Sequence, residues 1–308
     1  MRLNKRILAG ALPAIALLAA SCGSTSEPTQ TISFSPKVNS LYIPDNMMED
    51  VTCQTGMTYG ISMDLIKRTM ILQCNELRVG GKNLSFTTDA MPMDYLMNGV
   101  MWTAYVKNGA ATGAGNAEVS NLNGYVTNIV QYYKPTLGEP LAGNVVSPLP
   151  FITYHVNDYI VKTFAENSYF AGETVTQYPT EGGQETFKNS DPIYRVQFSS
   201  DMKKADVVIY KACFAKSMKD KGIVLEGIYV KGLDVKLTRS GYELSGTDII
   251  PESLGDGGAL LPYERYKFDS INIRTVNGDM SQISCDYVVA SVFRGTFTGY
   301  SVQRILNN

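Results

Sequence analysis

The sequence is poor in the residues that most enzymes and metal sites use. Its 308 residues contain one histidine and one tryptophan, and its five cysteines never occur as Cys-x-x-Cys. Transition metals are usually held by several histidine or cysteine ligands, so the composition argues against such a site. Neither sign of charge dominates, with 27 Lys and Arg against 29 Asp and Glu. We therefore expect no basic surface for a nucleic acid.

Long hydrophobic runs are also absent, with one short exception at the N-terminus. Three basic residues there precede the apolar stretch Ile7–Ala20, which is too short to span a bilayer. The stretch leads into Leu-Leu-Ala-Ala-Ser-Cys, which ends at Cys22 and resembles the lipobox of bacterial lipoproteins. The resemblance implies cleavage just before Cys22 and lipidation of its thiol. Ala19 departs from that family's pattern, which has a larger aliphatic residue, and an ordinary signal peptide cut nearby is the alternative.

The N-terminal segment therefore predicts where the protein resides. Residues 1–21 are predicted to be a lipoprotein signal peptide, and residues 22–30, rich in Ser and Thr, a flexible tether. Two or three acyl chains, at about 0.8 kcal/mol per buried methylene, would hold the protein at a membrane permanently. We expect a lipid-anchored protein of the cell envelope, at the outer membrane. The sequence leaves open whether it faces the periplasm or the cell surface.

Beyond residue 30 the patterns are mostly those of β-strands. Apolar and polar residues alternate in 194–198, 233–238 and 271–274, as they do in half-buried strands. Asn123-Gly124 and Asn277-Gly278 each have the composition of a tight hairpin turn. Helical patterns are limited to 211–221 and 91–99. The predicted fold class is therefore mainly β.

An internal repeat predicts how the strands are divided. Gly81–Pro92 is similar to Gly241–Pro251, and with one gap both read G-x-x-L-S-x-T-D-x-x-P. A strand pattern precedes each copy and an Asn-Gly pair follows each, which favours internal duplication over chance similarity. We expect two tandem antiparallel β-barrel or sandwich domains, at 31–165 and 191–308, joined by a linker at 166–190.

The second half resembles a known family. Residues 194–302, with the segment Lys203–Ala215 and the turn Gly241–Gly246, resemble uncharacterised calycin-like, or lipocalin-like, bacterial lipoproteins. The resemblance covers about a third of the chain firmly. It implies small antiparallel barrels or sandwiches on a lipid anchor, and it brings no known active site.

One combination of residues could support nucleophilic catalysis. His155 could act as a base, with Asp158 nearby in the sequence as its acidic partner. However, the chain has no G-x-S-x-G motif, and alternation makes His155 an ordinary strand residue. We expect no catalytic residue and no enzymatic activity.

Two other patterns imitate binding sites. Gly113-Ala114-Gly115 has the spacing of part of a dinucleotide fingerprint, but Glu118 replaces its last glycine and a hairpin tip is the better interpretation. Glu252, Asp256 and Glu264 surround a glycine-rich loop that could hold calcium, although the spacing of known calcium loops is missing. We therefore expect no metal and no cofactor.

The remaining cysteines allow disulfides because an exported protein meets an oxidising compartment. Cys53 and Cys74 lie in the first half, and Cys213 and Cys285 in the second. Sequence cannot choose among the three possible pairings. The alternative is that Cys74 and Cys285 are free thiols packed in a core.

Aromatic residues raise the possibility of ligand binding. The chain has 19 Tyr, 11 Phe and 13 Met beside its single Trp, Trp102. Five tyrosines could line a cavity or a glycan platform: Tyr132, Tyr133, Tyr263, Tyr266 and Tyr300. Since Tyr and Phe are also common strand residues, core packing is the simpler interpretation.

The leading functional hypothesis is a non-enzymatic envelope module whose barrel or interdomain cleft binds a small apolar or amphipathic ligand. The alternative is a structural or adhesive surface lipoprotein, or an accessory subunit of an envelope complex. A binder of small ligands needs an apolar cavity. A structural protein needs filled domains with an exposed apolar patch or an open strand edge.

Overall fold

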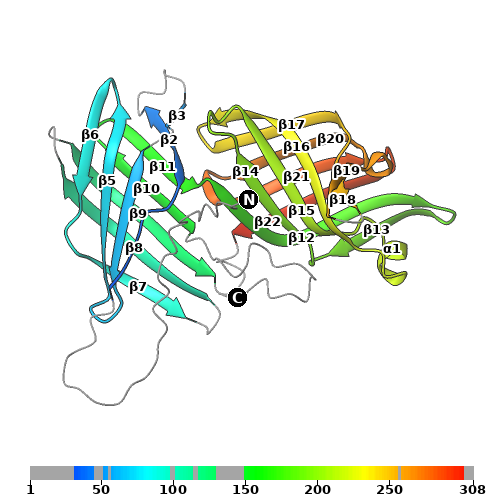
Figure 1. Ribbon diagram of the computed structural model, residues 1–308, viewed down its shortest axis with the longest axis horizontal. Coiled ribbons are helices and arrows are strands. Elements are labelled where there is room, and N and C mark those ends of the chain that lie inside the picture. Colours follow the sequence, from blue (N-terminus) through cyan, green and yellow to red (C-terminus); the bar gives the residue numbers. More distant parts are fainter. Residues whose placement is uncertain are drawn as a thin grey trace, which may run out of the picture.

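The computed structural model describes residues 31–44, 51–54, 57–97, 101–113, 117–129, 149–255 and 258–301. These residues form two antiparallel sheets of eleven strands each, which lie side by side as two lobes (Figure 1). The prediction of a mainly β fold is therefore confirmed. Cys22 and the predicted signal peptide and tether lie outside the described residues. Among the described residues, no helix has the length and hydropathy needed to cross a membrane.

The first lobe is an open, curled sheet, which we call the open lobe. Its strands follow the order β1-β4-β5-β7-β8-β9-β10-β11-β2-β3, with β6 beside β5, so that β1 and β3 are its two edges. The bounds are β1 (Thr31–Phe34), β2 (Val38–Pro44), β3 (Thr52–Gln54), β4 (Thr58–Asp64), β5 (Thr69–Val79), β6 (Lys82–Thr87), β7 (Met91–Met97), β8 (Met101–Thr112), β9 (Glu118–Ile129), β10 (Leu149–Val156) and β11 (Tyr159–Ala165).

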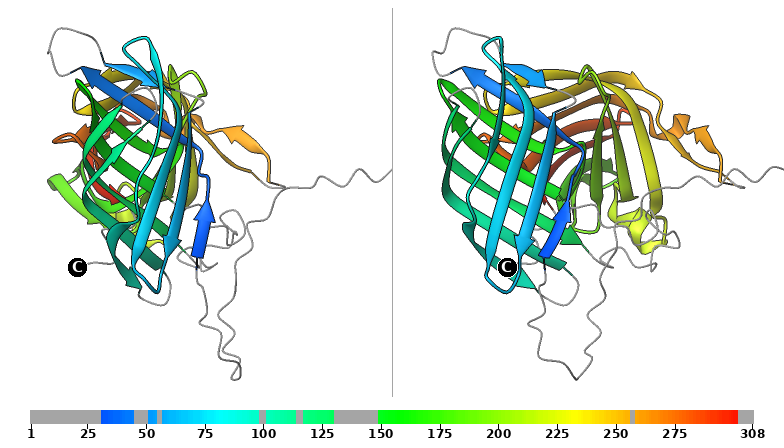
Figure 2. Two further views of the ribbon diagram at one scale, coloured as in Figure 1. Left: turned by 90° about the vertical axis from the view of Figure 1, so that its left-hand side faces the viewer. Right: turned by 60° about the vertical axis from the view of Figure 1, so that its left-hand side comes forward.

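The second lobe is a closed barrel. Eight strands follow the order β15-β14-β12-β22-β21-β20-β17-β16, and the pairing of β15 with β16 closes the ring (Figure 2). Strands β13, β18 and β19 lie outside the ring. The bounds are β12 (Asn167–Thr180), β13 (Gly183–Asn189), β14 (Ile193–Phe198), β15 (Lys204–Ala212), α1 (Lys216–Asp220), β16 (Leu225–Thr238), β17 (Gly241–Ile249), β18 (Glu252–Leu254), β19 (Leu260–Pro262), the 3-10 turn η1 (Glu264–Tyr266), β20 (Phe268–Val276), β21 (Asp279–Val289) and β22 (Phe293–Ser301).

Side-chain alternation places the core of each lobe. Along β21, Ile283, Cys285, Tyr287 and Val289 are buried, while the residues between them are half-buried on the outer face. This period of two follows from strand geometry, in which successive side chains point to opposite faces. The inward residues of the ring strands therefore meet in the centre of the barrel.

The two lobes contact each other through aromatic side chains. Phe164 of β11 packs against Phe198 and Tyr242 of the barrel, with ring centroids 5.4 and 5.7 Å apart. Strand β2 is buried along most of its length, since one face turns to the open lobe's core and the other to the barrel. Lys162 also donates a hydrogen bond to the carbonyl of Gly278 at 2.8 Å. The contact area is therefore apolar with polar bonds at its margin.

Several local predictions require correction. Residues 166–190 were predicted to be a linker, but they form β12 and β13, which pair with each other and with the barrel. Residues 91–99 were predicted to be helical, but 91–97 form β7, in which Met91 and Met93 are buried while Pro92 and Asp94 are exposed. Of the predicted helix at 211–221, only α1 is helical.

The two Asn-Gly pairs have different outcomes. Asn277 and Gly278 both have positive φ and join β20 to β21, so this predicted hairpin is confirmed. Asn123-Gly124 is instead inside β9, and that prediction is wrong. A Cβ at Gly124 would lie 2.9 Å from the carbonyl oxygen of Phe151 on β10. The glycine is therefore required by a close strand approach and not by a turn.

The two copies of the sequence repeat occupy similar places. Each includes the second strand of a hairpin, β6 after β5 and β17 after β16. Leu84 and Leu244, the shared leucines, are both buried. Internal duplication stays a prediction.

Candidate functional site

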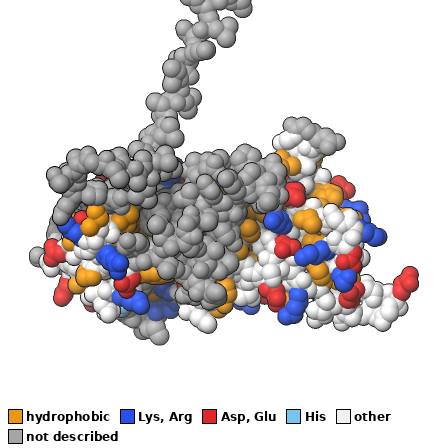
Figure 3. Space-filling model, turned by 90° about the horizontal axis from the view of Figure 1, so that it is seen from below, with side chains coloured by type: hydrophobic (Ala, Val, Ile, Leu, Met, Phe, Trp, Pro, Cys, Tyr) orange, Lys and Arg blue, Asp and Glu red, His pale blue; other side chains and the backbone are white. Residues whose placement is uncertain are grey.

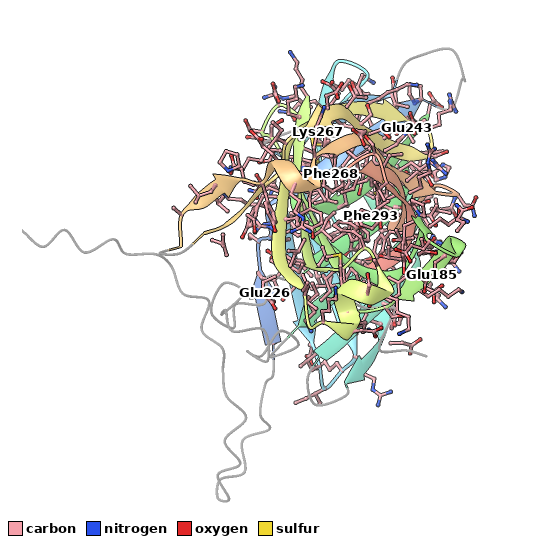
Figure 4. All side chains as sticks on the ribbon, turned by 90° about the vertical axis from the view of Figure 1, so that its right-hand side faces the viewer. Glu185, Glu226, Glu243, Lys267, Phe268 and Phe293 are labelled. Atoms are coloured by element: carbon pink, nitrogen blue, oxygen red, sulfur yellow. The ribbon has the colours of Figure 1, made fainter. Side chains whose placement is uncertain are left out.

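Aromatic side chains fill the centre of the closed barrel. Phe297 is fully buried and stacks on Tyr194, with ring centroids 3.9 Å apart. Phe214 contacts the ring of Phe293 at 5.8 Å. In Figure 4, which views the barrel side of the molecule, Phe268 and Phe293 lie among densely packed side chains. The place where a lipocalin-like protein would hold a ligand is therefore occupied by the protein's own rings.

Polar groups inside the barrel are used by the protein itself. The hydroxyls of Thr176 and Tyr287 form a hydrogen bond of 2.9 Å. Met218 of α1 is buried, and its sulfur accepts a hydrogen bond from the hydroxyl of Tyr266 at 3.9 Å. Burial raises the pKa of Tyr287 well above its usual range. These contacts stabilise the filled interior.

A chain of buried hydroxyls crosses the core of the open lobe. Tyr59 forms hydrogen bonds with Tyr154 at 2.6 Å and with Thr163 at 2.9 Å. Thr163 continues the chain to Ser40 at 2.6 Å, and the thiol of Cys74 lies 4.0 Å from the Tyr154 hydroxyl. Burial raises the pKa of Cys74 to about 12. The thiol is therefore protonated at neutral pH and is a poor nucleophile, so we interpret this network as structural.

The two residues considered for catalysis do not interact with each other. His155 is half-buried on β10, opposite Ile160 of β11, and Asp158 lies in the turn between these strands. No hydrogen bond or ion pair joins the two side chains within the described part of the chain. This position agrees with the prediction that His155 is an ordinary strand residue.

The glycine and carboxylate patterns do not form ligand sites either. Gly113 donates a backbone hydrogen bond to Ala117 at 3.0 Å, in the hairpin between β8 and β9. Glu252 forms an ion pair with Lys231, and Glu264 begins η1. Asp256 lies outside the described residues. No group of three acidic, histidine or cysteine side chains suited to a metal occurs among the residues that the structure describes.

The tyrosine platform that the sequence left possible is not assembled from the residues that can be placed. Tyr263 and Tyr266 pack edge to face with centroids 5.0 Å apart, and Tyr266 is buried in the barrel core. Tyr300 is half-buried on the outer side of β22. Tyr132, Tyr133 and the side chain of Trp102 lie outside the described residues.

The four cysteines beyond Cys22 are free. Cys74, Cys213 and Cys285 are buried, and Cys53 is half-buried on the edge strand β3. The interpretation of Cys74 and Cys285 as packed free thiols is therefore confirmed, and the four described cysteines form none of the disulfides that the sequence allowed. Burial raises the pKa of Cys53 to about 12, so its thiol is also unreactive at neutral pH.

An apolar hairpin stands away from the barrel, and sequence reasoning missed it. We call β18 and β19 the projecting hairpin; it extends beyond the barrel wall in both views of Figure 2. Leu260 and Leu261 are 36% and 53% exposed, and Ile250 just before β18 is 46% exposed. Consecutive strand residues point to opposite faces, so exposure of both leucines means that neither face is covered at this point. A sequence pattern cannot separate such a strand from a buried one.

The hairpin is attached firmly at its base. Ser253 and Glu252 pair with Ile228 and Tyr229 of β16, and the Tyr263 amide donates a hydrogen bond to the Pro251 carbonyl at 2.7 Å. β19 pairs with β18 on one side and has no other strand partner among the described residues. It therefore combines an open strand edge with exposed leucines.

The rest of the described surface is mixed in charge. Ion pairs such as Lys216–Asp220, Lys219–Asp191 and Lys204–Asp234 join neighbouring strands or helical turns. On the face seen in Figure 3, acidic and basic side chains are interspersed. Hollows occur on the outside of the sheets, one over β12, β20, β21 and β22 and a smaller one over β1, β4 and β5.

Comparisons with known proteins add little to this description. No protein-family model matches the sequence, and no curated protein matches it. A solved structure of intact Ap-TbpB, with its N and C lobes, matches with a TM-score of 0.26 and 8% sequence identity, over 89% of this chain and 77% of that chain. A TM-score this low carries no conclusion about fold, partner or function.

Proposed function

We propose that the protein is a non-enzymatic, lipid-anchored component of the cell envelope that binds another envelope protein through its projecting hairpin. This is the alternative that the sequence left open, an adhesive or accessory surface lipoprotein. The anchor would be the lipidated thiol of Cys22. Neither a cofactor nor a nucleic acid has a part in the proposed function.

The observation that carries this proposal is the combination of a filled barrel and an uncovered apolar hairpin. Because Phe297, Tyr194 and Phe214 occupy the barrel centre, a small apolar ligand would have to displace aromatic rings from a packed core. Such packing resists even small volume changes. The filled interior therefore favours recognition at the outer surface.

The chemistry of the hairpin favours a protein as the partner. A peptide strand added to β19 would gain main-chain hydrogen bonds along an open edge, as in other cases of strand addition. Leu260 and Leu261 would be buried on the two faces of the enlarged sheet. Burying one leucine side chain contributes about 1.5–3 kcal/mol, so two provide a useful part of a specific interface.

Site-specific photo-crosslinking in intact cells tests this function. A photoreactive leucine analogue at Leu261 of the full chain should give one discrete protein adduct of constant mass. The same analogue at Ile223, another exposed apolar residue, serves as the matched control and should give none. The double substitution Leu260→Ser and Leu261→Ser should abolish the adduct formed from an analogue placed at Ile250.

Two results would contradict the proposal. Equal crosslinking from Leu261 and Ile223 would show that the hairpin has no specific partner. Adducts of lipid alone from Leu261 would show that the hairpin lies on the bilayer and does not bind a protein.

A further inference from the structure

The outer wall of the closed barrel contains a shallow groove lined by both polar and apolar groups. It lies where β12, β22, β21 and β20 run side by side, on the opposite face of the sheet from the packed core. Its walls include Gln177 of β12, Asn272 of β20 and Asp286 of β21, and Arg294 and Thr296 come from β22 between them. The hollow has a volume of about 460 Å³, within the range of small-molecule sites.

The middle of β22 carries little side-chain bulk on either face. Gly295 pairs with Tyr287 of β21, and a Cβ at Gly295 would lie within 2.1 Å of the Tyr287 ring. The ring takes up the space of the missing side chain and points inward to Thr176. On the outer face the neighbouring position holds only the short side chain of Thr296. The wall is therefore hollowed along this strand and flanked by longer polar side chains.

Charge along the groove is incompletely compensated. Asp286 accepts a charged hydrogen bond from Arg274 at 2.9 Å, which pairs these two residues. The Arg294 residue is exposed, and its side chain forms no hydrogen bond or ion pair with the described residues. Its guanidinium offers five donors in a planar fork that matches a carboxylate. The groove therefore has one cation available for an anionic group.

The neutral polar groups match sugar hydroxyls. The Oε1 of Gln177 accepts a hydrogen bond from Gln184 at 3.2 Å, which uses the acceptor of this side chain and not its two amide N–H donors. Asn272 supplies both a donor and an acceptor, and Thr296 supplies a hydroxyl. The side chain of Val288 lies beside them and can contact the C–H faces of a sugar ring.

From this arrangement we infer that the groove binds a short oligosaccharide carrying a carboxylate, such as one with a uronic or sialic acid residue. A peptide strand cannot add here because both edges of β22 are already paired, with β12 and β21. A doubly charged phosphate would meet the Asp286 carboxylate as well as Arg294. A singly charged sugar acid matches the one positive charge of Arg294, which remains once Asp286 is paired with Arg274 beside the groove.

Titration calorimetry of the lipid-free mature chain tests this inference. The probes are trigalacturonate, sialyllactose and a hyaluronan tetrasaccharide, with maltotriose as the neutral comparison. At least one acidic probe should bind at least tenfold more tightly than maltotriose. Arg294→Gln should weaken that binding by at least about tenfold, as expected for the loss of a charged hydrogen-bonding pair. Asn272→Ala should weaken binding of the same probe by about threefold or more.

Matched variants keep the result interpretable. Arg265→Gln changes an exposed arginine on η1, outside the groove, and should leave the affinity unchanged. Leu261→Ser in the projecting hairpin should also leave it unchanged, so that failure of the hairpin proposal is separate from failure of this one. No binding of any acidic probe at millimolar concentration, or equal binding by the parent chain and a folded Arg294→Gln variant, would overturn the inference. Tighter binding of maltotriose than of every acidic probe would also overturn it.

Discussion

Replacing Phe297 by alanine removes a ring from the centre of the closed barrel. The ring is fully buried and stacks on Tyr194, and it also covers Gly299, where a Cβ would lie 2.4 Å from a Phe297 ring carbon. Because Gly299 has no side chain, the next inward position on β22 cannot refill the space. Truncation of a buried Phe costs about 3–5 kcal/mol when the cavity persists. We therefore expect the free energy of unfolding of the barrel to fall by an amount in the upper part of this range.

Urea unfolding followed by circular dichroism measures this loss. The matched control is Ile71→Ala on the outer face of the open lobe, where the side chain is 38% exposed and the expected loss is below about 1 kcal/mol. Benzene should stabilise the Phe297→Ala variant and leave the parent chain unchanged, since apolar cavities of this kind stay dry and accept such ligands. A loss of less than about 1 kcal/mol at Phe297 would show that the interior is loosely filled. That result would restore the barrel as a ligand site.

Three other predictions concern separate parts of the molecule. Burial holds the pKa of Cys74 at about 12 in the folded state, above the ordinary value of 9.0, so the contribution of this thiol to the free energy of unfolding should be constant below about pH 9. Above that pH the thiol ionises first in the unfolded state, and the free energy of unfolding should fall by up to about 1.4 kcal/mol per pH unit. Urea unfolding of the Cys74→Ala variant should show a smaller decrease of this free energy with pH. An unchanged slope of free energy against pH would refute the assignment. Gly124→Ala should lower the melting temperature, since the added Cβ would lie 2.9 Å from the Phe151 carbonyl, and overpacking costs about 1–3 kcal/mol. A melting temperature equal to that of the parent would show that β10 can move away at no cost. Cys22→Ala should abolish palmitate labelling and leave uncleaved precursor, whereas a labelled variant would show that the lipid is attached elsewhere.

The parts of the fold that depend on local patterns could be predicted from the sequence. Alternation identified the strands at 194–198 and 271–274, and the turn chemistry of Asn277-Gly278 located a hairpin. Positive φ at both turn residues is a local requirement, so it leaves a local mark in the sequence. The mainly β class followed from the same signals.

Features set by long-range packing could not be predicted. The turn at 181–182 and the start of β13 are exposed, and their polar composition resembled a linker although the segment is a hairpin of β12 and β13. Gly124 has the composition of a turn residue, but its role is to admit the backbone of β10. In the first case the residues face solvent, and in the second the close approach is made by another strand. A local sequence pattern records neither.

The candidate sites were also beyond local patterns. The groove takes side chains from four strands between Val175 and Thr296, and the pairing of β12 with β22 brings the two ends of this segment together. The leucines of the projecting hairpin look like core residues, because apolar strand residues are usually buried. Only the absence of a covering layer over Leu260 and Leu261 distinguishes them.

The central claim is that this protein recognises its partners on outer surfaces because its barrel interior is filled. Native mass spectrometry of the mature chain from Gly23, purified gently from its own envelope, tests this claim most directly. The account predicts that no apolar molecule co-purifies. The measured mass should equal that of the polypeptide once any bound saccharide or protein has been subtracted. A reproducible lipophilic ligand of small-molecule mass, lost on denaturation and retained by the Leu261→Ser and Arg294→Gln variants, would contradict it.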